Sequence, residues 1–384
     1  MAATTGAMGR VSDRAKRTPR NFDWMLLLAT LILLSFGLLC QFSKAHDSGS
    51  KDFFKQLFNV AVGLVPFAIF WLVKPKLWMR VANALYLINI SLLAIVLKMG
   101  VSKNGAERWI NLGFTEFQPS EAAKILIVLT LATFFAKRYD QIHKFSTFAL
   151  SFVHVAIPIA LILEQPHMGA SLAIIATWLC ICLAAQVPWK FVLGAGLAVL
   201  SLLTIAFTVP AIGKYVLKDY HLKRVMSMFQ KDEKGKSFQT DRAAIALGSG
   251  GLLGTGFLKG EQKKLGMIPE QQTDFVFTII GEEGGLVGST LVLIAFGFFF
   301  FRIWLIFLSA TEPYYRMIAA GLLGMLAFHT IVNLGMVLQL LPVVGLWLPF
   351  MSYGGTAMWL CLACVGLLLN VRSKEKPVLF EMNR

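Results

Sequence analysis

Residues 277–306 read FTIIGEEGGLVGSTLVLIAFGFFFFRIWLI. Apart from Glu282, Glu283 and Arg302, this stretch carries no charge. A helix crosses the hydrocarbon core of a membrane with about 20 apolar residues. The stretch is longer than one straight crossing needs, which predicts a tilted helix or one that extends beyond the bilayer.

The rest of the chain has the same apolar character. It has 384 residues, of which 57% are hydrophobic and 15% are charged, and its mean hydropathy is +0.67. Soluble domains have about 45–50% apolar and about 25% charged residues, so this composition excludes an ordinary soluble protein. We predict an all-α, polytopic integral membrane protein with about ten transmembrane helices, at residues 23–42, 54–73, 80–99, 119–137, 146–164, 168–187, 190–209, 277–306, 314–340 and 348–370.

Basic residues near the ends of the spans predict the orientation of the chain. Cytoplasmic loops carry an excess of Lys and Arg. The basic tail 1–22, the loops after every second span and the tail 371–384 fall on one side if both termini are cytoplasmic. The net charge of +15 could indicate nucleic-acid binding in a soluble protein. Here topology and contact with anionic lipids account for it, and we expect no nucleic-acid partner.

Two larger loops, 100–118 and 210–276, fall on the opposite, extracytoplasmic side. The second loop, between the seventh and eighth spans, is long enough that a function is expected. It is also rich in cations: Lys214, Lys218, Lys223, Arg224, Lys231, Lys234, Lys236, Arg242, Lys259, Lys263 and Lys264. Long loops translocate largely regardless of charge. The cations therefore either have no special role or meet an anionic substrate at the outer face.

Polar groups at membrane depth gather towards the same side. Ionisable residues within spans are costly and are often functional. Glu121 and Lys124 lie three residues apart on one helical face, as a structural ion pair or as a substrate contact. Asp274 precedes the quoted stretch and can either cap its helix or act chemically.

The glycine-rich stretch 248–256 can wrap a phosphate with its backbone amides or can simply form a loop. It lacks the Gly-Lys-Ser or Gly-Lys-Thr ending of a Walker motif. The five cysteines lie in apolar runs, so the spacing indicates neither a disulfide framework nor a zinc site.

A series of short motifs resembles the SEDS family of membrane glycosyltransferases, whose members RodA and FtsW polymerise peptidoglycan. The resemblance covers nearly the whole chain, and the motifs occur in the family's order. They are Gly105-Ala106-Glu107-Arg108-Trp109-Ile110, Gln118-Pro119-Ser120-Glu121 with Lys124, Gln165-Pro166-His167-Met168-Gly169, Asp219-Tyr220 with Arg224-Val225, Ile245-Ala246-Leu247-Gly248-Ser249-Gly250-Gly251, Pro269-Glu270-Gln271-Gln272-Thr273-Asp274-Phe275, Asn333-Leu334-Gly335-Met336 and Leu348-Pro349-Phe350-Met351-Ser352-Tyr353-Gly354-Gly355.

Two positions depart from the family pattern. Gln272 stands where the family usually has a His before Thr-Asp, and His167 stands where it usually has an acid. No role of that imidazole or of that acid is therefore transferred to this chain. The stretches 248–251 and 333–336 look more like RodA, whereas Gln262-Lys263 is similar to FtsW. The sequence is thus RodA-like, with FtsW as the closest alternative.

The resemblance implies a lipid II polymerase of the bacterial cytoplasmic membrane, acting in cell elongation and shape. It implies Asp274 as the catalytic base, and Arg108, Lys124, Arg224 and Arg242 are candidates to neutralise the pyrophosphate. Gln118, Ser120, Glu121 and Ser352 are candidate supporting residues, and the Glu121–Lys124 pair is expected to shape the cavity rather than transfer protons.

A divalent cation, Mg²⁺ or Mn²⁺, would suit the leaving group, but no ligand cluster requires one. The resemblance also implies a partner, a class B penicillin-binding protein that cross-links the product. The alternatives are a lipid II flippase, an FtsW-like division polymerase and a non-enzymatic scaffold.

Overall fold

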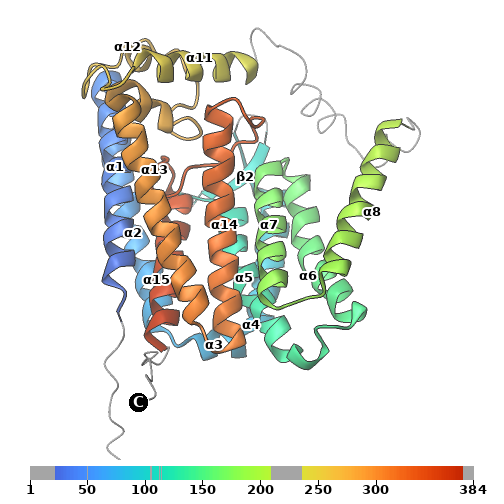
Figure 1. The fold of residues 1–384 in the computed structure, drawn as a ribbon. Helices are drawn as coiled ribbons and strands as arrows, with labels where there is room; N and C mark the ends of the chain where they lie inside the picture. The colour runs from blue at the N-terminus through green and yellow to red at the C-terminus, as the bar shows by residue number, and fades with distance from the viewer. Residues whose placement is uncertain are drawn as a thin grey trace, which may run out of the picture.

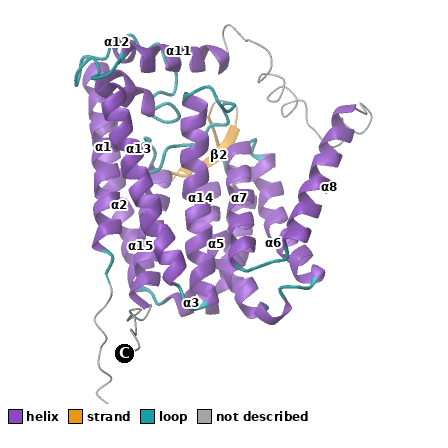
Figure 2. Ribbon diagram, in the orientation of Figure 1, coloured by secondary structure: helices purple, strands orange, loops and turns teal. Residues whose placement is uncertain are grey.

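A computed structural model of the protein describes residues 22–49, 51–103, 106–111, 113, 115–208 and 236–374. Its long helices run roughly parallel in a bundle (Figures 1 and 2). They are α1 (Trp24–Ser48), α2 (Asp52–Leu72), α4 (Ala82–Met99), α5 (Pro119–Lys137), α6 (Phe145–Glu164), α7 (Met168–Ala184), α8 (Trp189–Thr208), α13 (Phe277–Ser309), α14 (Pro313–Val337) and α15 (Gly355–Lys374). Each of the predicted spans overlaps one of these helices.

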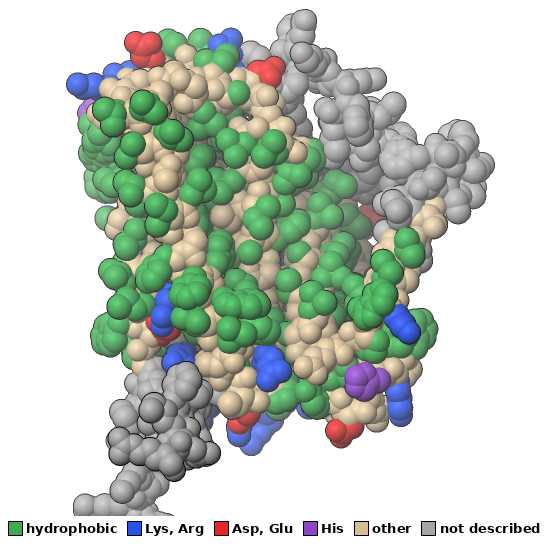
Figure 3. Space-filling view, viewed as in Figure 1, with side chains coloured by type: hydrophobic (Ala, Val, Ile, Leu, Met, Phe, Trp, Pro, Cys, Tyr) green, Lys and Arg blue, Asp and Glu red, His purple; other side chains and the backbone are tan. Residues whose placement is uncertain are grey.

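The helices confirm an integral membrane protein. Eight of those in the described part of the chain are long and apolar enough to cross a membrane, and α7 is a shorter apolar helix. Hydrophobic side chains cover the flank of the bundle, and charged side chains lie towards its two ends (Figure 3). The last helix begins at Gly355, later than the predicted residue 348, because residues 342–354 run without regular structure or in turns.

Short elements lie at the ends of the bundle. The helix α3 (Pro75–Arg80) and the 3-10 turn Tyr139–Gln141 lie at one end, which we call the α3 end. The helices α11 (Lys236–Ser249) and α12 (Glu261–Lys264) lie across the other, the α11 end (Figure 1). The predicted loop 210–276 therefore contains helices, and its residues 209–235 lie outside the described part, as do 1–21 and 375–384 of the two tails.

Three of the helices form the centre of the bundle. In α5, α14 and α15 between 67% and 78% of the most apolar window is buried within the protein, against 17% in α2 and 22% in α4. The central helices therefore face protein rather than lipid, which is why they can carry Lys124, His329 and Asn370, all fully buried.

A small sheet in the loop 100–118 was not predicted. The strands β1 (Val101–Lys103), β2 (Ala106–Asn111) and β3 (Glu116–Phe117) form an antiparallel sheet in the order β1-β2-β3. Val101 pairs with Trp109 and Ile110 pairs with Phe117. The sheet fixes the position of β2, which carries Arg108, next to the helices. The all-α prediction thus holds for the membrane helices but misses this sheet.

The helix α13 is broken at Gly285, where the backbone has φ +61° and ψ −156°. The glycine-rich stretch fills the break: Thr255 N donates to Glu282 O at 2.9 Å, and Leu286 N donates to Gly251 O at 2.9 Å. Backbone groups freed by a break at membrane depth need partners within the protein. The stretch 248–256 supplies them, so amides of Thr255 and Gly256 are used in the fold rather than offered to a phosphate.

Two contacts fasten the α3 end. The carboxylate of Asp23 caps α1 by accepting a bond from Leu26 N at 2.9 Å, and it also pairs with Arg302 of α13 at 2.8 Å. The amide of Asn370 donates to the carbonyls of Phe70 and Val73, where α2 ends. These side chains form hydrogen bonds with backbone groups at helix ends, which have no partner within their own helix.

We predict that Gly285→Ala destabilises the protein. An added Cβ would lie 2.3 Å from Gly254 N and 2.7 Å from Leu252 O, and the positive φ is itself strained for alanine. A strained backbone of this kind costs about 1–3 kcal/mol, so thermal unfolding in detergent should show a lower Tm.

The matched control is Gly297→Ala in the same helix, where nothing lies within 4 Å of the added Cβ. Alanine is favoured over glycine in a helix interior by roughly 0.5–1 kcal/mol. The control should therefore keep or raise the Tm. Equal Tm values for the two variants would argue against the packed break.

Candidate active site

Asp274 lies in a turn that precedes α13, and this turn is held by three consecutive backbone carbonyls. Gln272 O accepts bonds from Gln41 Nε2 at 3.1 Å and from Tyr353 N at 2.8 Å. Thr273 O accepts from the Ser352 hydroxyl. Asp274 O accepts from Asn333 Nδ2 at 2.8 Å. Three separate parts of the chain therefore fix the backbone that carries the carboxylate.

Asp274 lies two residues before Val276, which is the N-cap residue of α13. The side chain of Val276 makes no capping hydrogen bond. The carboxylate is partly exposed and its Oδ2 lies beside Gly345, since a Cβ built on that glycine would be 3.4 Å away. A half-buried carboxylate on a fixed turn can exchange a proton with a bound molecule.

Ser352 belongs to the support of this turn. Its hydroxyl donates to Thr273 O and accepts a bond from Leu348 N at 2.7 Å. The amide side chain of Gln56 holds the same segment from α2, because it donates to Ser352 O at 3.2 Å and accepts from Gly354 N at 3.1 Å. Ser352 is buried, and in this arrangement it positions the Asp274 turn.

Glu121 and Lys124 form a buried ion pair on α5. Lys124 Nζ lies 2.8 Å from Glu121 Oε1, and the two residues are 0% and 1% exposed. The pair reaches two aromatic side chains: Lys124 Nζ lies 3.0 Å from His329 Nε2, and Trp347 Nε1 donates to Glu121 Oε2 at 2.9 Å. The ammonium of Lys124 therefore faces this buried cluster and not the surface.

Asn333 connects the ion pair to the Asp274 turn. Its Nδ2 donates both to Asp274 O and to Leu346 O, at 2.8 Å and 2.6 Å. Leu346 precedes Trp347, whose indole bonds to Glu121. The pair is thus bonded to the segment that lies beside the carboxylate.

Two of the motifs meet at His167. Its Nδ1 lies 3.1 Å from the Ser120 hydroxyl and 3.3 Å from Gln118 Nε2. Arg108 of β2 reaches the same turn, where Nε donates to Gln165 O at 2.8 Å and a terminal nitrogen donates to Pro166 O. The structure therefore brings Arg108, Gln118 and Ser120 together around residues 165–167, and His167 bonds there in place of the family's acid.

The remaining predicted cations lie elsewhere. Arg242 is partly buried on α11, which packs across the end of the bundle against α13 and α14. Its neighbour Asp241 accepts a bond from Gln339 Nε2 at 3.1 Å. Arg224 lies outside the described residues.

The sequence motifs did not indicate a second buried charge cluster. Lys263 is 1% exposed, and its Nζ lies 2.5 Å from Glu283 Oε1 and 2.8 Å from Asp47 Oδ2. The Ser43 hydroxyl donates to the same Glu283 carboxylate, at 2.7 Å from Oε1. The cluster ties α1, α12 and the broken part of α13 together. Its sequence signals were the Glu282-Glu283 pair and the polar end of the first span.

Glu282 and Lys44 extend this cluster towards the Asp274 turn. The Glu282 carboxylate accepts from Gln262 N at 2.6 Å and from Lys263 N at 3.2 Å, at the start of α12. Lys44 Nζ donates to Gln271 Oε1 at 3.0 Å. The segment from α12 to residue 271 is therefore bonded to both α1 and α13.

Within the described ranges, no group of three or more His, Cys, Asp or Glu side chains lies close enough to hold a metal ion. The acids near the Asp274 turn bind Lys263, Lys124 or backbone amides instead. These residues therefore do not fit a resident metal centre.

The fold and site define an integral membrane protein with a supported carboxylate near the α11 end of its helix bundle. Residues 20–377 match the family model for FtsW, RodA and SpoVE, described as "Cell cycle protein". The chain belongs to this family.

Named relatives and solved structures agree with that assignment. The chain is 33% identical to "Peptidoglycan glycosyltransferase MrdB" of Escherichia coli K12, over 93% of this chain and 95% of that protein. It is similar to the Rod shape determining protein RodA of Thermus thermophilus, with a TM-score of 0.67, 27% identity, and coverage of 91% and 96%. It also resembles a chain of a structure titled "Structural coordination of polymerization and crosslinking by a peptidoglycan synthase complex", with a TM-score of 0.79, 29% identity, and coverage of 93% and 99%. These likenesses favour the RodA-like interpretation over the FtsW-like one.

We predict that Lys263→Met strongly destabilises the protein. The substitution leaves the buried carboxylate of Glu283 and the half-buried carboxylate of Asp47 without their cation. Breaking one side of a buried ion pair costs about 3–5 kcal/mol. Thermal unfolding in detergent should therefore give a clearly lower Tm.

Lys264→Met is the matched control, because Lys264 is the exposed neighbour and surface changes usually stay within about 0.5 kcal/mol. Adding Glu283→Gln to Lys263→Met should recover part of the loss, since the two residues are coupled. If Lys263→Met and Lys264→Met unfold at the same temperature, the cluster does not hold the segment.

Proposed function

We propose that this protein is a peptidoglycan glycosyltransferase that polymerises lipid II at the outer face of the bacterial cytoplasmic membrane. The product is a β-1,4 glycan strand for cell elongation and shape. One observation carries the proposal: Asp274 sits on a turn whose three carbonyls are held from three directions, in a family whose relatives are named peptidoglycan glycosyltransferases.

The substrate class suits the architecture. Lipid II has a long apolar tail, a doubly anionic pyrophosphate and a polar disaccharide with a peptide. The tail can lie against the apolar flank of the bundle (Figure 3), while the sugars reach the end near which Asp274 lies. A site near one end of the helices therefore suits all three parts of the molecule.

We assign Asp274 the role of general base. The hydroxyl oxygen at position 4 of the acceptor sugar attacks the anomeric carbon of the donor, and its proton passes to the Asp274 carboxylate. The bond between that carbon and the pyrophosphate oxygen breaks, and the pyrophosphate leaves with the electron pair. Because the turn is fixed, the carboxylate needs little reorganisation when the acceptor binds.

The other predicted residues divide into two roles. Arg108, Arg224 and Arg242 supply positive charge for the pyrophosphate. Glu121, Lys124 and Ser352 hold the segments beside Asp274, whereas Gln118 and Ser120 order the turn at His167. Lys124 was also a candidate for the pyrophosphate, and its full burial against Glu121 favours the supporting role. A divalent cation that accompanies the pyrophosphate remains a prediction.

The orientation and domain boundaries are part of this proposal. Residues 23–370 form the membrane domain, between cytoplasmic tails 1–22 and 371–384. Cations at the ends of helices near the α3 end support a cytoplasmic location for that end, among them Lys76, Lys137, Lys144 and Arg372. The α11 end then faces outwards with Asp274.

We also propose a class B penicillin-binding protein as the partner that cross-links the glycan. The similarity to a chain of a peptidoglycan synthase complex supports such an assembly. The competing functions are a lipid II flippase and a non-enzymatic scaffold. A flippase needs polar groups along the whole path across the membrane, whereas the carboxylate, its supports and the second charge cluster gather near one end here.

We predict that Asp274→Asn abolishes glycan synthesis without unfolding the protein. Asparagine has nearly the same shape but cannot accept the proton, and loss of a general base costs about 10²–10⁴-fold in rate. The full-length protein, with and without its partner, should be supplied with labelled lipid II and the polymer measured.

The control is Glu261→Gln, which neutralises an exposed carboxylate on α12 and should keep full activity. Both variants should unfold at the wild-type Tm. Unchanged polymer from Asp274→Asn would remove Asp274 from the mechanism. Movement of lipid II across vesicles without polymer would instead identify a flippase.

A separate prediction concerns stereochemistry. One direct displacement at the anomeric carbon turns an α-linked pyrophosphate donor into a β-linked glycan. The new linkages should therefore be β when their anomeric configuration is measured by NMR. Retention would require a second nucleophile and would contradict the single displacement.

A further inference from the structure

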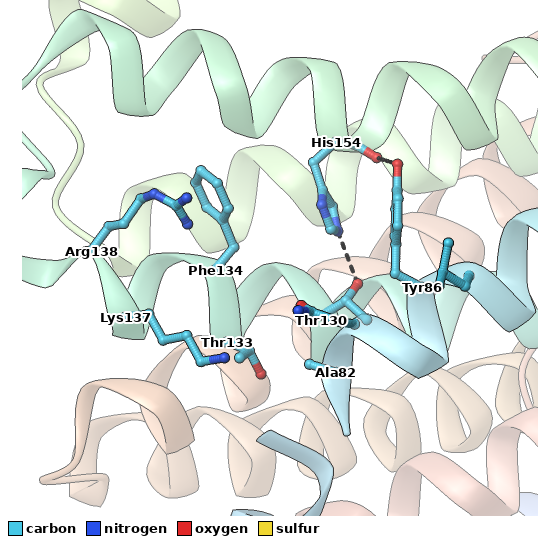
Figure 4. A pocket seen from close by; sticks show the side chains of 10 residues that line it. Ala82, Tyr86, Thr130, Thr133, Phe134, Lys137, Arg138 and His154 are labelled. Carbon is cyan, nitrogen blue, oxygen red and sulfur yellow. Dashed lines mark hydrogen bonds between the residues drawn. The ribbon is translucent and has the colours of Figure 1, made fainter. Parts of the chain in front are cut away.

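A cavity of about 360 Å³ lies between α4, α5 and α6, away from the Asp274 turn (Figure 4). It is lined by Ala82, Asn83, Tyr86, Leu87, Thr130, Thr133, Phe134, Lys137, Arg138 and His154. Lys137 ends α5, whose first residue follows Gln118 of the His167 cluster. A helix of this length spans about 28 Å, so the cavity and that cluster lie at opposite ends of α5.

Hydrogen bonds and ring contacts build one wall of this cavity. Tyr86 donates its hydroxyl proton to His154 O at 2.9 Å, and the two rings stack with their centres 4.1 Å apart. His154 Nε2 also lies 3.0 Å from the Thr130 hydroxyl (Figure 4). The wall thus links α4, α5 and α6 and is preformed.

The charged side chains that line the cavity are basic. Lys137 and Arg138 both line it, and no acidic side chain does. Among the described residues neither cation forms an ion pair, and the Arg138 guanidinium lies 4.3 Å from the centre of the Phe134 ring. In Figure 4 the Arg138 side chain extends to the Phe134 ring and the Lys137 side chain extends towards Thr133. The other titratable groups of the lining, Tyr86 and His154, add no negative charge at neutral pH.

The surroundings of the cavity are apolar on the side away from the bundle. Leu87, which lines it, is 67% exposed, and Ile88 beside it is 50% exposed. In an integral membrane protein such side chains face lipid. An occupant can therefore place an anionic group between the two cations and an apolar part along α4.

We propose that this cavity binds a phosphate ester, with its oxygens between Lys137 and Arg138 and any acyl chain along Leu87. Arginine and lysine are the side chains that bind phosphate oxygens, and polar pockets of basic residues between membrane helices bind lipid headgroups. The two sources of such a group are a phospholipid headgroup and a small soluble phosphate ester. The site is separate from the glycosyl transfer at Asp274.

The test uses the full-length protein in detergent. Binding of short-chain phosphatidylglycerol, short-chain phosphatidylcholine and glycerol 3-phosphate is measured by native mass spectrometry. The wild type should bind phosphatidylglycerol more tightly than phosphatidylcholine. The double variant Lys137→Gln/Arg138→Gln should lose about tenfold in that affinity, with an unchanged Tm.

The matched control is Lys144→Gln/Lys190→Gln, which removes two exposed cations at the same end of the bundle that do not line the cavity. It should bind as the wild type does. Equal losses in both double variants, or no loss in either, would overturn the site. The soluble ester is the occupant if the wild type binds glycerol 3-phosphate as tightly as phosphatidylglycerol and only Lys137→Gln/Arg138→Gln loses that binding. If glycerol 3-phosphate binds more weakly than phosphatidylglycerol, the occupant is the lipid headgroup.

Discussion

The break in α13 at Gly285 is the constraint on which the α11 end of the molecule depends. A helix interrupted at membrane depth exposes backbone groups that water cannot satisfy. Here the segment 251–256 returns along the helix and bonds to both sides of the break. The same turn of α13 carries Glu282 and Glu283, which bind the amides that open α12 and the ammonium of Lys263. The chain between the break and Asp274 therefore has little freedom.

Two buried lysines hold the segments around the Asp274 turn from different directions. Lys263 joins α12 to α1 and α13, whereas Lys124 joins α5 to the segment around Trp347 through Glu121. Each lies in a cluster that supplies a carboxylate and further polar contacts, as burial of a charge requires. Asp274 itself stays partly exposed, and its backbone carbonyl is held by Asn333. The partly exposed carboxylate therefore lies on a segment whose backbone is held in place by several parts of the chain.

Hydropathy was sufficient to predict the membrane helices, because each needs only a local run of apolar residues. It could not predict the partners of the polar groups. Glu283 binds Ser43, which is 240 positions away, and Trp347 binds Glu121, which is 226 positions away. The sheet at 101–117 depends on pairing across short turns with little periodicity. Asp274, Ser352 and Arg108 were found through motifs of the family. Gln41 and His329 lie outside those motifs, and the likeness of Gln262-Lys263 to FtsW gave Lys263 no structural role.

The basic side chains at the two ends of the bundle differ in whether they are paired with carboxylates. Near the α11 end, Lys124 and Lys263 are buried and neutralised by carboxylates, so they stabilise the fold and contribute little field to the surface. At the α3 end, Lys137 and Arg138 line a cavity without an acidic neighbour. Phosphate binding is less favourable for a cation that is already paired with a carboxylate than for an unpaired cation, because the phosphate must replace the existing contact. Among these four cations, the pair at the α3 end is therefore the better match for an anionic lipid or small phosphate ester, and the pyrophosphate of the transfer reaction must be met by other groups near Asp274.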